Sequence, residues 1–259
     1  RLETLLVGEP TPEVDPVALD LYLALQYSPS PGTILEGYSK LPPAHYLLWD
    51  RGRIRIGRYW WPRPAAARPS TPAEASERLV ATLGEAVRSQ LVSDVPLGAF
   101  LSGGIDSSIV VSLMARHSSR PVRTFSIGFE EKEWDETGYA RQVAERYRTE
   151  HSELVVRPSA REIFDDLVRH YAEPFADSSA IPTWYVSKLA RTSVTVALSG
   201  DGGDELFAGY TRYLGLALSA PLGAVLAPPA ARRAGAAAHL LWRDRTRRST
   251  AFRAAKLLS

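Results

Sequence analysis

Two short loops combine glycines, hydroxyls and carboxylates, and each follows an apolar run. The first, "LSGGIDSS", spans residues 101–108, and the second, "SGDGGDE", spans residues 199–205. Gly103 and Gly104 carry no side chains, so backbone N–H groups of the first loop can close on an anion. The helix predicted after this loop points its orphan N–H groups and positive dipole end at the same place. These groups suit a phosphate or pyrophosphate, although a glycine turn with a serine N-cap explains the same letters.

The acids in the two loops favour a metal ion between protein and phosphate. The first loop lacks the lysine of the P-loop pattern GxxxxGK[ST] and instead carries Asp106. A carboxylate beside a phosphate is repulsive unless a cation lies between them, and Mg²⁺ typically uses one or two carboxylates plus substrate phosphates. Asp204 in the second loop is a natural second carboxylate. Its alternative role is a helix N-cap, and the two roles are compatible.

Strands that alternate with helices are expected to position these loops. This alternation predicts βαβ units and an α/β fold with a mostly parallel sheet flanked by helices on both faces. Both loops then follow the carboxyl ends of strands, where open parallel sheets bind ligands. Apolar runs predict strands at 95–101, 122–129, 151–156 and 194–199, and helical apolar spacing predicts helices at 72–91, 107–117, 136–147, 160–171 and 181–191.

Residues 1–61 show a different pattern. A helix is predicted after Asp15, which serves as its N-cap, with Pro16 at the first helical position. Two strand-like runs flank the "DRG" turn at residues 50–52, which indicates a hairpin. A proline-rich stretch then suggests a linker. The next helix begins with a capping box at Thr71.

Composition excludes several classes of protein and site. The chain has 259 residues, 45% of them hydrophobic and 23% charged, with a net charge of +2, which does not indicate a nucleic-acid binder. No unbroken apolar stretch reaches the roughly 18 residues of a membrane span. The absence of cysteine excludes disulfides, thiolate metal sites and a cysteine nucleophile within these residues, and it suits the cytoplasm, where we expect the protein. The only methionine is Met114, so we expect an internal piece of a longer protein.

Several motifs carry a family resemblance. "FLSGGIDSS" resembles the PP-loop of N-type ATP pyrophosphatases, which holds the β,γ-pyrophosphate of ATP. With "SVTVALSGDGGDELFAGYTRY" and "EPFADSSAIPTWYVSKLAR", it makes the chain similar, from about Leu19 to Tyr213, to the synthetase domain of glutamine-dependent asparagine synthetases. Residues 1–61, with "KLPPAHYLLWD" and "GRYWWP", resemble the end of the glutaminase domain that precedes it.

The resemblance implies a domain arrangement. Residues 73–259 would form an adenine nucleotide alpha hydrolase-like synthetase domain, truncated at its C-terminus. Residues 62–72 would be the linker, and residues 1–61 the C-terminal part of an Ntn-type α+β glutaminase domain.

The resemblance also implies roles for individual residues. Leu101 and Ile127 would line the adenine and ribose pocket, and Ser199 and Gly200 would contact the adenylate. Asp201 falls where the family has an acid, often glutamate, near the acyl-adenylate and the incoming ammonia, so it is the catalytic candidate despite its shorter side chain. The groups around pyrophosphate would be Ser102, Gly103, Gly104, Asp106, Ser107 and Ser108, with Asp106 and Asp204 on Mg²⁺. Ser178 and Ser179 either cap the helix that follows them or contact the amino-acid substrate.

The implied reaction joins ammonia to a carboxylate at the expense of ATP. The carboxylate, aspartate first of all, attacks the α-phosphate and releases pyrophosphate, and ammonia derived from glutamine then displaces AMP. The loops would bind ATP rather than the acyl group. They therefore do not exclude a lactam-forming enzyme or another amidotransferase that acts on a different carboxylate. A non-catalytic nucleotide-binding fragment is the third reading. We expect small molecules as partners, and neither nucleic acid nor a membrane. The full-length protein could form a homodimer.

Two departures from the family bear on activity. The family's glutaminase uses an N-terminal cysteine, and this chain has none. The family also has a lysine beyond the second loop that reaches the pyrophosphate, but the only lysine after Asp204 is Lys256, in unrelated surroundings. We therefore expect the isolated chain to be inactive or nearly so.

Overall fold

The computed structural model describes residues 5–8, 10, 12–63, 71–131, 133, 135–157 and 159–225. Backbone contacts divide the chain into two compact units, Arg1–Ser199 and Gly200–Ser259. All strands of the described residues belong to the first unit. No helix in the described part of the chain has both the length and the apolar character needed to cross a bilayer.

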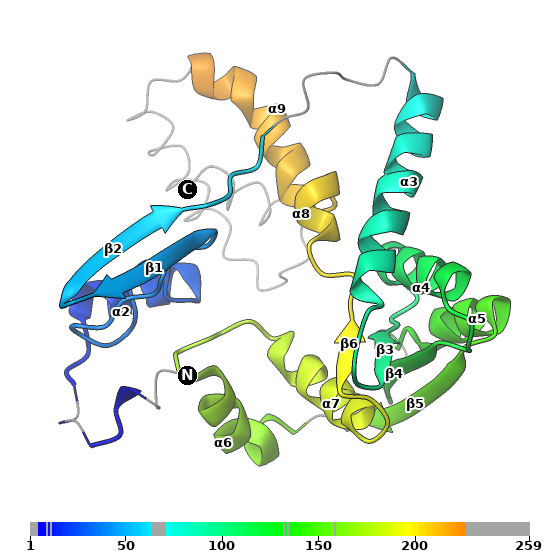
Figure 1. The fold of residues 1–259 in the computed structure, drawn as a ribbon, viewed down its shortest axis with the longest axis horizontal. Helices are drawn as coiled ribbons and strands as arrows, with labels where there is room; N and C mark the ends of the chain where they lie inside the picture. Colours follow the sequence, from blue (N-terminus) through cyan, green and yellow to red (C-terminus); the bar gives the residue numbers. More distant parts are fainter. Residues whose placement is uncertain are drawn as a thin grey trace, which may run out of the picture. The chain divides into compact units, whose positions relative to one another are not determined.

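The first unit contains a four-stranded parallel sheet (Figure 1). It consists of β3 (Leu97–Phe100), β4 (Arg123–Phe129), β5 (Glu150–Val156) and β6 (Val196–Leu198), in the order β5-β4-β3-β6. The chain moves outward from β3 through β4 to β5 and then returns to the other side of β3. The strand order therefore reverses at β3, and such a reversal leaves a crevice at the carboxyl ends of the strands.

Helices cover both faces of this sheet, as the alternation in the sequence predicts. On one face, a buried cluster joins the sheet to α3 (Pro72–Gln90), α4 (Ile105–His117) and α5 (Thr137–Tyr147). On the other face, a second cluster joins it to α7 (Ala180–Arg191). The chain reaches α7 through α6 (Ala160–Tyr171), which packs beside it.

The two clusters follow from the two-residue period of β3. Ala99 and Leu101 are at most 1% exposed and belong to the first cluster, whereas Phe100 packs with Phe125 in the second. Successive side chains of a strand point to opposite faces, so an unbroken apolar run is what a strand covered on both faces requires. The predicted α/β class is therefore confirmed.

The N-terminal segment has the predicted local structure. In α2 (Pro16–Leu25), the side chain of Asp15 accepts hydrogen bonds from the N–H groups of Val17 and Ala18. β1 (His45–Asp50) and β2 (Arg53–Arg58) pair as an antiparallel hairpin. Positive φ angles at Arg51 and Gly52, 45° and 78°, give the turn type that matches the twist of a two-residue hairpin.

The proposed domain boundaries, including the glutaminase assignment of residues 1–61, stay predictions. Residues 64–70 of the predicted linker lie outside the described part of the chain. The helix after this gap, α3, has its predicted cap, because Thr71 Oγ1 accepts a hydrogen bond from the N–H of Glu74.

The second unit contains α8 (Gly203–Phe207) and α9 (Thr211–Val225). The N-cap interpretation of Asp204 is wrong, because α8 begins one residue before it. Gly202 occupies the cap position with φ +90°, a left-handed conformation that glycine adopts without steric cost. The carboxylate of Asp204 therefore does not cap the start of α8.

The close packing of β3 against β4 gives a testable prediction. A Cβ at Gly98 would lie 2.7 Å from the carbonyl oxygen of Arg123 and 2.9 Å from Cε2 of Phe125. Gly98→Ala should therefore destabilise the protein by about 1–3 kcal/mol through overpacking. Gly138→Ala is the matched control, since its Cβ would meet nothing within 4 Å and alanine favours a helix by about 1 kcal/mol. Thermal unfolding followed by circular dichroism should show a lower Tm for the first variant and an equal or higher Tm for the second, and equal losses would contradict this packing.

Candidate functional site

The first loop connects β3 to α4 and is held closely against α5. Gly103 has φ +82°, and a Cβ there would lie 2.5 Å from both the backbone nitrogen of Ala140 and Cβ of Tyr139. Glycine is therefore required at this position twice over, by conformation and by space. This contact brings α5 to the loop.

Hydrogen bonds within the loop fix its shape. The Oγ atoms of Ser102 and Ser107 lie 3.0 Å apart, and the N–H of Gly104 donates to Ser102 Oγ at 3.2 Å. The hydroxyls of Ser107 and Ser108 both donate to the carbonyl oxygen of Gly104, at 3.2 and 2.6 Å. This carbonyl is turned toward the helix, so it does not oppose an anion at the helix start. The first N–H groups of α4 have no intrahelical acceptor and are free to bind one.

Asp106 lies in the first turn of α4 and is half-buried. A carboxylate is favoured at this end of a helix by the dipole. No group of three or more potential metal-ligating side chains occurs among the described residues. Mg²⁺ that accompanies phosphates typically combines one or two carboxylates with phosphate oxygens and water. The residues present fit Mg²⁺ carried in with a phosphate ligand.

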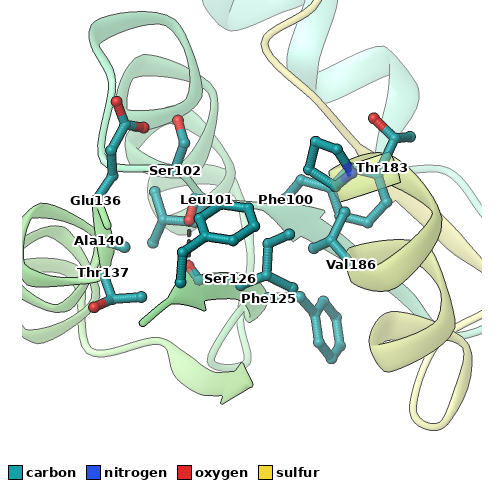
Figure 2. A pocket seen from close by; sticks show the side chains of 13 residues that line it. Phe100, Leu101, Ser102, Phe125, Ser126, Glu136, Thr137, Ala140, Thr183 and Val186 are labelled. Atoms are coloured by element: carbon teal, nitrogen blue, oxygen red, sulfur yellow. Dashed lines mark hydrogen bonds between the residues drawn. The ribbon is translucent and has the colours of Figure 1, made fainter. Parts of the chain in front are cut away.

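A pocket of about 220 Å³ adjoins the loop at the carboxyl end of the sheet (Figure 2). Leu101 forms part of its floor, and the hydroxyl of Ser126 donates a hydrogen bond to the Leu101 carbonyl. In Figure 2, Glu136, the N-cap residue of α5, and Thr137 at its start lie on one side, and Thr183 and Val186 from α7 lie on the opposite side. Ile127 also contributes to the lining, so both residues predicted for the adenine and ribose pocket lie there.

The pocket and the loop are continuous because Ser102 belongs to both. An apolar pocket between two helices can take a flat base, and a loop rich in N–H donors can take an anion attached to it. Their arrangement therefore suits one molecule with an aromatic end and a phosphate end.

The strand next to β3 ends at the same edge of the sheet. Ala99 of β3 pairs with Leu198 of β6, so Ser199 follows directly from that edge. The residues from Gly200 onward belong to the second unit, and this includes Asp201 and Asp204. Their roles, like that of Gly200, stay predictions.

Contacts within the second unit give its loop a defined shape. A Cβ at Gly209 would clash with the carboxylate of Asp204, so glycine is needed where the chain leaves α8. The hydroxyl of Tyr210 donates a hydrogen bond of 2.8 Å to Glu205 and thereby lowers the pKa of that carboxyl below its ordinary value. Asp201 is exposed, and Asp204 is half-buried.

Ser178 and Ser179 lie outside the lining of this pocket. Ser179 occupies the N-cap position of α7, but its side chain makes no capping hydrogen bond. Its N–H instead donates to Asp177 Oδ1 at 2.8 Å. Ser178 lines a separate cavity of about 430 Å³ together with residues of α6. Ser179 is therefore the N-cap residue of α7, as one of the two predictions has it, although its side chain makes no capping hydrogen bond. Substrate contact stays a prediction for both serines.

Several residues that line the pocket beside Leu101 belong to no recognisable sequence motif. Glu136 and Thr137 follow β4 at the carboxyl edge, so their place in the chain could have indicated them. Thr183 and Val186 lie inside an ordinary amphipathic helix, where nothing in the spacing distinguishes a pocket wall from a packing face.

Comparison with known proteins identifies the family. A family model described as asparagine synthase matches residues 78–258, which is most of the chain. The chain belongs to the asparagine synthase family. Both glycine-rich loops and the motif at residues 173–191 lie inside the matched range, whereas the two motifs of residues 1–61 lie outside it.

Relatives in this family are similar over most of the chain. A putative asparagine synthetase [glutamine-hydrolyzing] 2 of Methanocaldococcus jannaschii is 41% identical over 76% of this chain and 39% of its own length. Asparagine synthetase [glutamine-hydrolyzing] 1 of Bacillus subtilis is 36% identical over 82% of this chain and 33% of its own length. The chain therefore spans well under half of these relatives. Among solved structures, an NH3-dependent NAD synthetase from Campylobacter jejuni matches with a TM-score of 0.37 and 14% identity, over 52% of this chain and 60% of its own.

The glycine pair of the first loop allows a sharp test of the site. Gly103→Ala should weaken binding of ATP with Mg²⁺ by about tenfold or more, because a non-glycine residue at this strained conformation costs about 1–3 kcal/mol. Gly104→Ala should stay within about threefold, since φ there is −66° and its Cβ would meet only Ser102 Oγ, at 3.3 Å. Isothermal titration calorimetry on the full-length protein measures both affinities, and thermal unfolding checks that each variant is folded. Equal effects of the two substitutions would contradict the geometry described for the loop.

Proposed function

We propose that the full-length protein is an ATP-dependent amide ligase that activates a carboxylate, aspartate first of all, and transfers ammonia derived from glutamine to it. The observation that supports this most strongly is the continuity of the Leu101 pocket with the loop of residues 102–108 at the carboxyl end of β3. The relatives are asparagine synthetases [glutamine-hydrolyzing], and they suggest the reaction class.

In this proposal, the adenine and ribose of ATP lie between α5 and α7, against Leu101 and Ile127. The phosphates extend past Ser102 to the backbone N–H groups at the start of α4. Gly103 lets the loop backbone approach them, Gly104 is proposed to contact them through its backbone, and the hydroxyls of Ser107 and Ser108 hold the loop in shape through the Gly104 carbonyl. Ser199 and Gly200 are proposed to contact the adenylate.

Mg²⁺ is proposed to be held by Asp106, with Asp204 as the second carboxylate. When bound, it would neutralise the negative charge that accumulates on pyrophosphate as this group leaves. The first turn of α4 presents one of these two carboxylates, and phosphate oxygens would complete the coordination.

The reaction then needs two displacements. A carboxylate oxygen of the substrate forms a bond to the α-phosphorus as the bond from this phosphorus to the bridging oxygen of pyrophosphate breaks. The nitrogen of ammonia next forms a bond to the acyl carbon, and AMP leaves with the former carboxylate oxygen. Asp201 is proposed to orient ammonia or accept its proton. Positioning and charge neutralisation are the main work of such a site.

The isolated 259-residue chain is proposed to be inactive or nearly so. The family's reaction draws on a lysine segment beyond the second loop, and Lys256, the only lysine after Asp204, lies outside the described residues. The cytoplasm is the proposed location, and a homodimer of the full-length protein stays a prediction.

Exchange of labelled pyrophosphate into ATP tests the adenylation step. In the full-length protein, we expect exchange that depends on aspartate, followed by formation of AMP and asparagine when ammonia is added. Asp106→Asn should lower the exchange rate by about 100-fold or more, because it removes a charged metal ligand. Asp94→Asn is the control, because this exposed residue precedes β3 at the opposite edge of the sheet.

The carboxylate that supports exchange distinguishes an asparagine synthetase from an enzyme that acts on another acid. Exchange supported by another acid from a panel, and not by aspartate, would replace the substrate and keep the adenylation chemistry. No exchange with any acid, in a protein that binds ATP, would overturn the proposal of an enzyme.

A further inference from the structure

The segment between α6 and α7 is held by a distant part of the chain. After α6 ends at Tyr171, residues 172–179 run to the start of α7 without regular structure. Tyr27 and Phe175 form an antiparallel bridge, and the N–H of Ala176 donates to the carbonyl oxygen of Gln26 at 3.0 Å. The segment therefore pairs with the chain that follows α2.

A charged pair completes this attachment. Lys40 Nζ lies 2.7 Å from Glu173 Oε2, and Glu173 Oε1 accepts a hydrogen bond from the N–H of Ile34 at 3.2 Å. Lys40 also donates to the carbonyl oxygen of Ser28 at 2.7 Å. The two carboxylate oxygens of Glu173 thus contact two places in the N-terminal segment, the side chain of Lys40 and the backbone of Ile34.

The environment of this pair makes it stronger than an ordinary surface pair. The side chains of Lys40 and Glu173 are 31% and 19% exposed, whereas Arg88 and Glu85 on α3 are 59% and 64% exposed. Exposed pairs contribute little because water screens them. A partly buried carboxylate with a backbone donor and a cation loses more when one partner is removed.

The neighbours of the segment are anchored in another way. α7 is fixed to the sheet through Val186, Leu189 and Ala190, which pack with Phe125. Loss of the Lys40–Glu173 pair should therefore leave α7 and the pocket wall that it supplies in place. The part that loosens is the stretch that ends in Ser178 and Ser179, the residues predicted to contact the carboxylate substrate.

We propose that Lys40 and Glu173 are positioning residues that fix residues 172–179 for binding of the carboxylate substrate. This inference rests on the proposed function, because it assumes that a carboxylate is activated at this site. Lys40 belongs to residues 1–61 and Glu173 to the synthetase part, so the pair also makes substrate binding depend on the segment that precedes the synthetase.

Steady-state pyrophosphate exchange with the full-length protein tests this role. Lys40→Met should raise the KM for the carboxylate about tenfold, as expected when a binding group is misplaced by a fraction of an ångström, with the KM for ATP unchanged. Glu173→Ala should do the same, and Glu173→Gln should have a smaller effect because its amide oxygen still accepts from Ile34. Lys40→Arg keeps the cation and should restore most of the affinity.

Two controls separate this inference from folding and from the proposed function. Arg88→Met removes the exposed pair on α3 and should leave both KM values unchanged. An unchanged affinity for ATP shows that the Lys40 and Glu173 variants are folded. The double variant Lys40→Met/Glu173→Ala should be no worse than the poorer single variant, since the two residues act as one unit.

The outcomes are distinguishable. Absence of exchange in the unmodified protein would overturn the proposed function. Normal exchange in the unmodified protein with an unchanged carboxylate KM in Lys40→Met and Glu173→Ala would overturn the positioning role alone. Parallel rises in the KM for ATP and for the carboxylate would also overturn it, because they would indicate a general structural role.

Discussion

The close approach of Gly103 to the start of α5 is the contact on which the site depends. With no side chain at Gly103, the backbone of the loop after β3 lies directly against Tyr139 and Ala140. This contact places Glu136 and Thr137 at the pocket, and it leaves the start of α4 open beside the same pocket. A larger residue would push apart the two elements that the proposed ligand bridges.

The sheet supplies the rigid frame for this contact. β3 is covered on both faces, so Leu101 leaves its end in a fixed position, tied to β4 by the hydrogen bond from its N–H to the Phe125 carbonyl oxygen. The reversal of strand order at β3 puts a second strand end, that of β6, at the same edge. Binding groups on loops can then be positioned by elements whose packing has nothing to do with the ligand.

The sequence predicted the elements well because apolar periodicity is a local signal. The strands and helices of the α/β part occur where their spacing indicated, and the caps at Asp15 and Thr71 are as expected. The capping role of Asp204 was predicted wrongly, because the left-handed conformation at Gly202 starts α8 earlier. Contacts between distant segments have no such signal. Thr183 and Val186 as a pocket wall, and the pairing of Lys40 with Glu173, depend on how helices and loops meet in the folded chain.

Hydrogen–deuterium exchange can measure whether the loop of residues 102–108 binds pyrophosphate. In the full-length protein, pyrophosphate with Mg²⁺ should slow exchange of the backbone amides at Gly103 and at residues 105–107, because these N–H groups become donors to the anion. AMP should leave them unchanged and protect the region around Leu101 and Ser126 instead. Protection of these loop amides by AMP but not by pyrophosphate, or no protection by either ligand in a protein that binds both, would contradict the account.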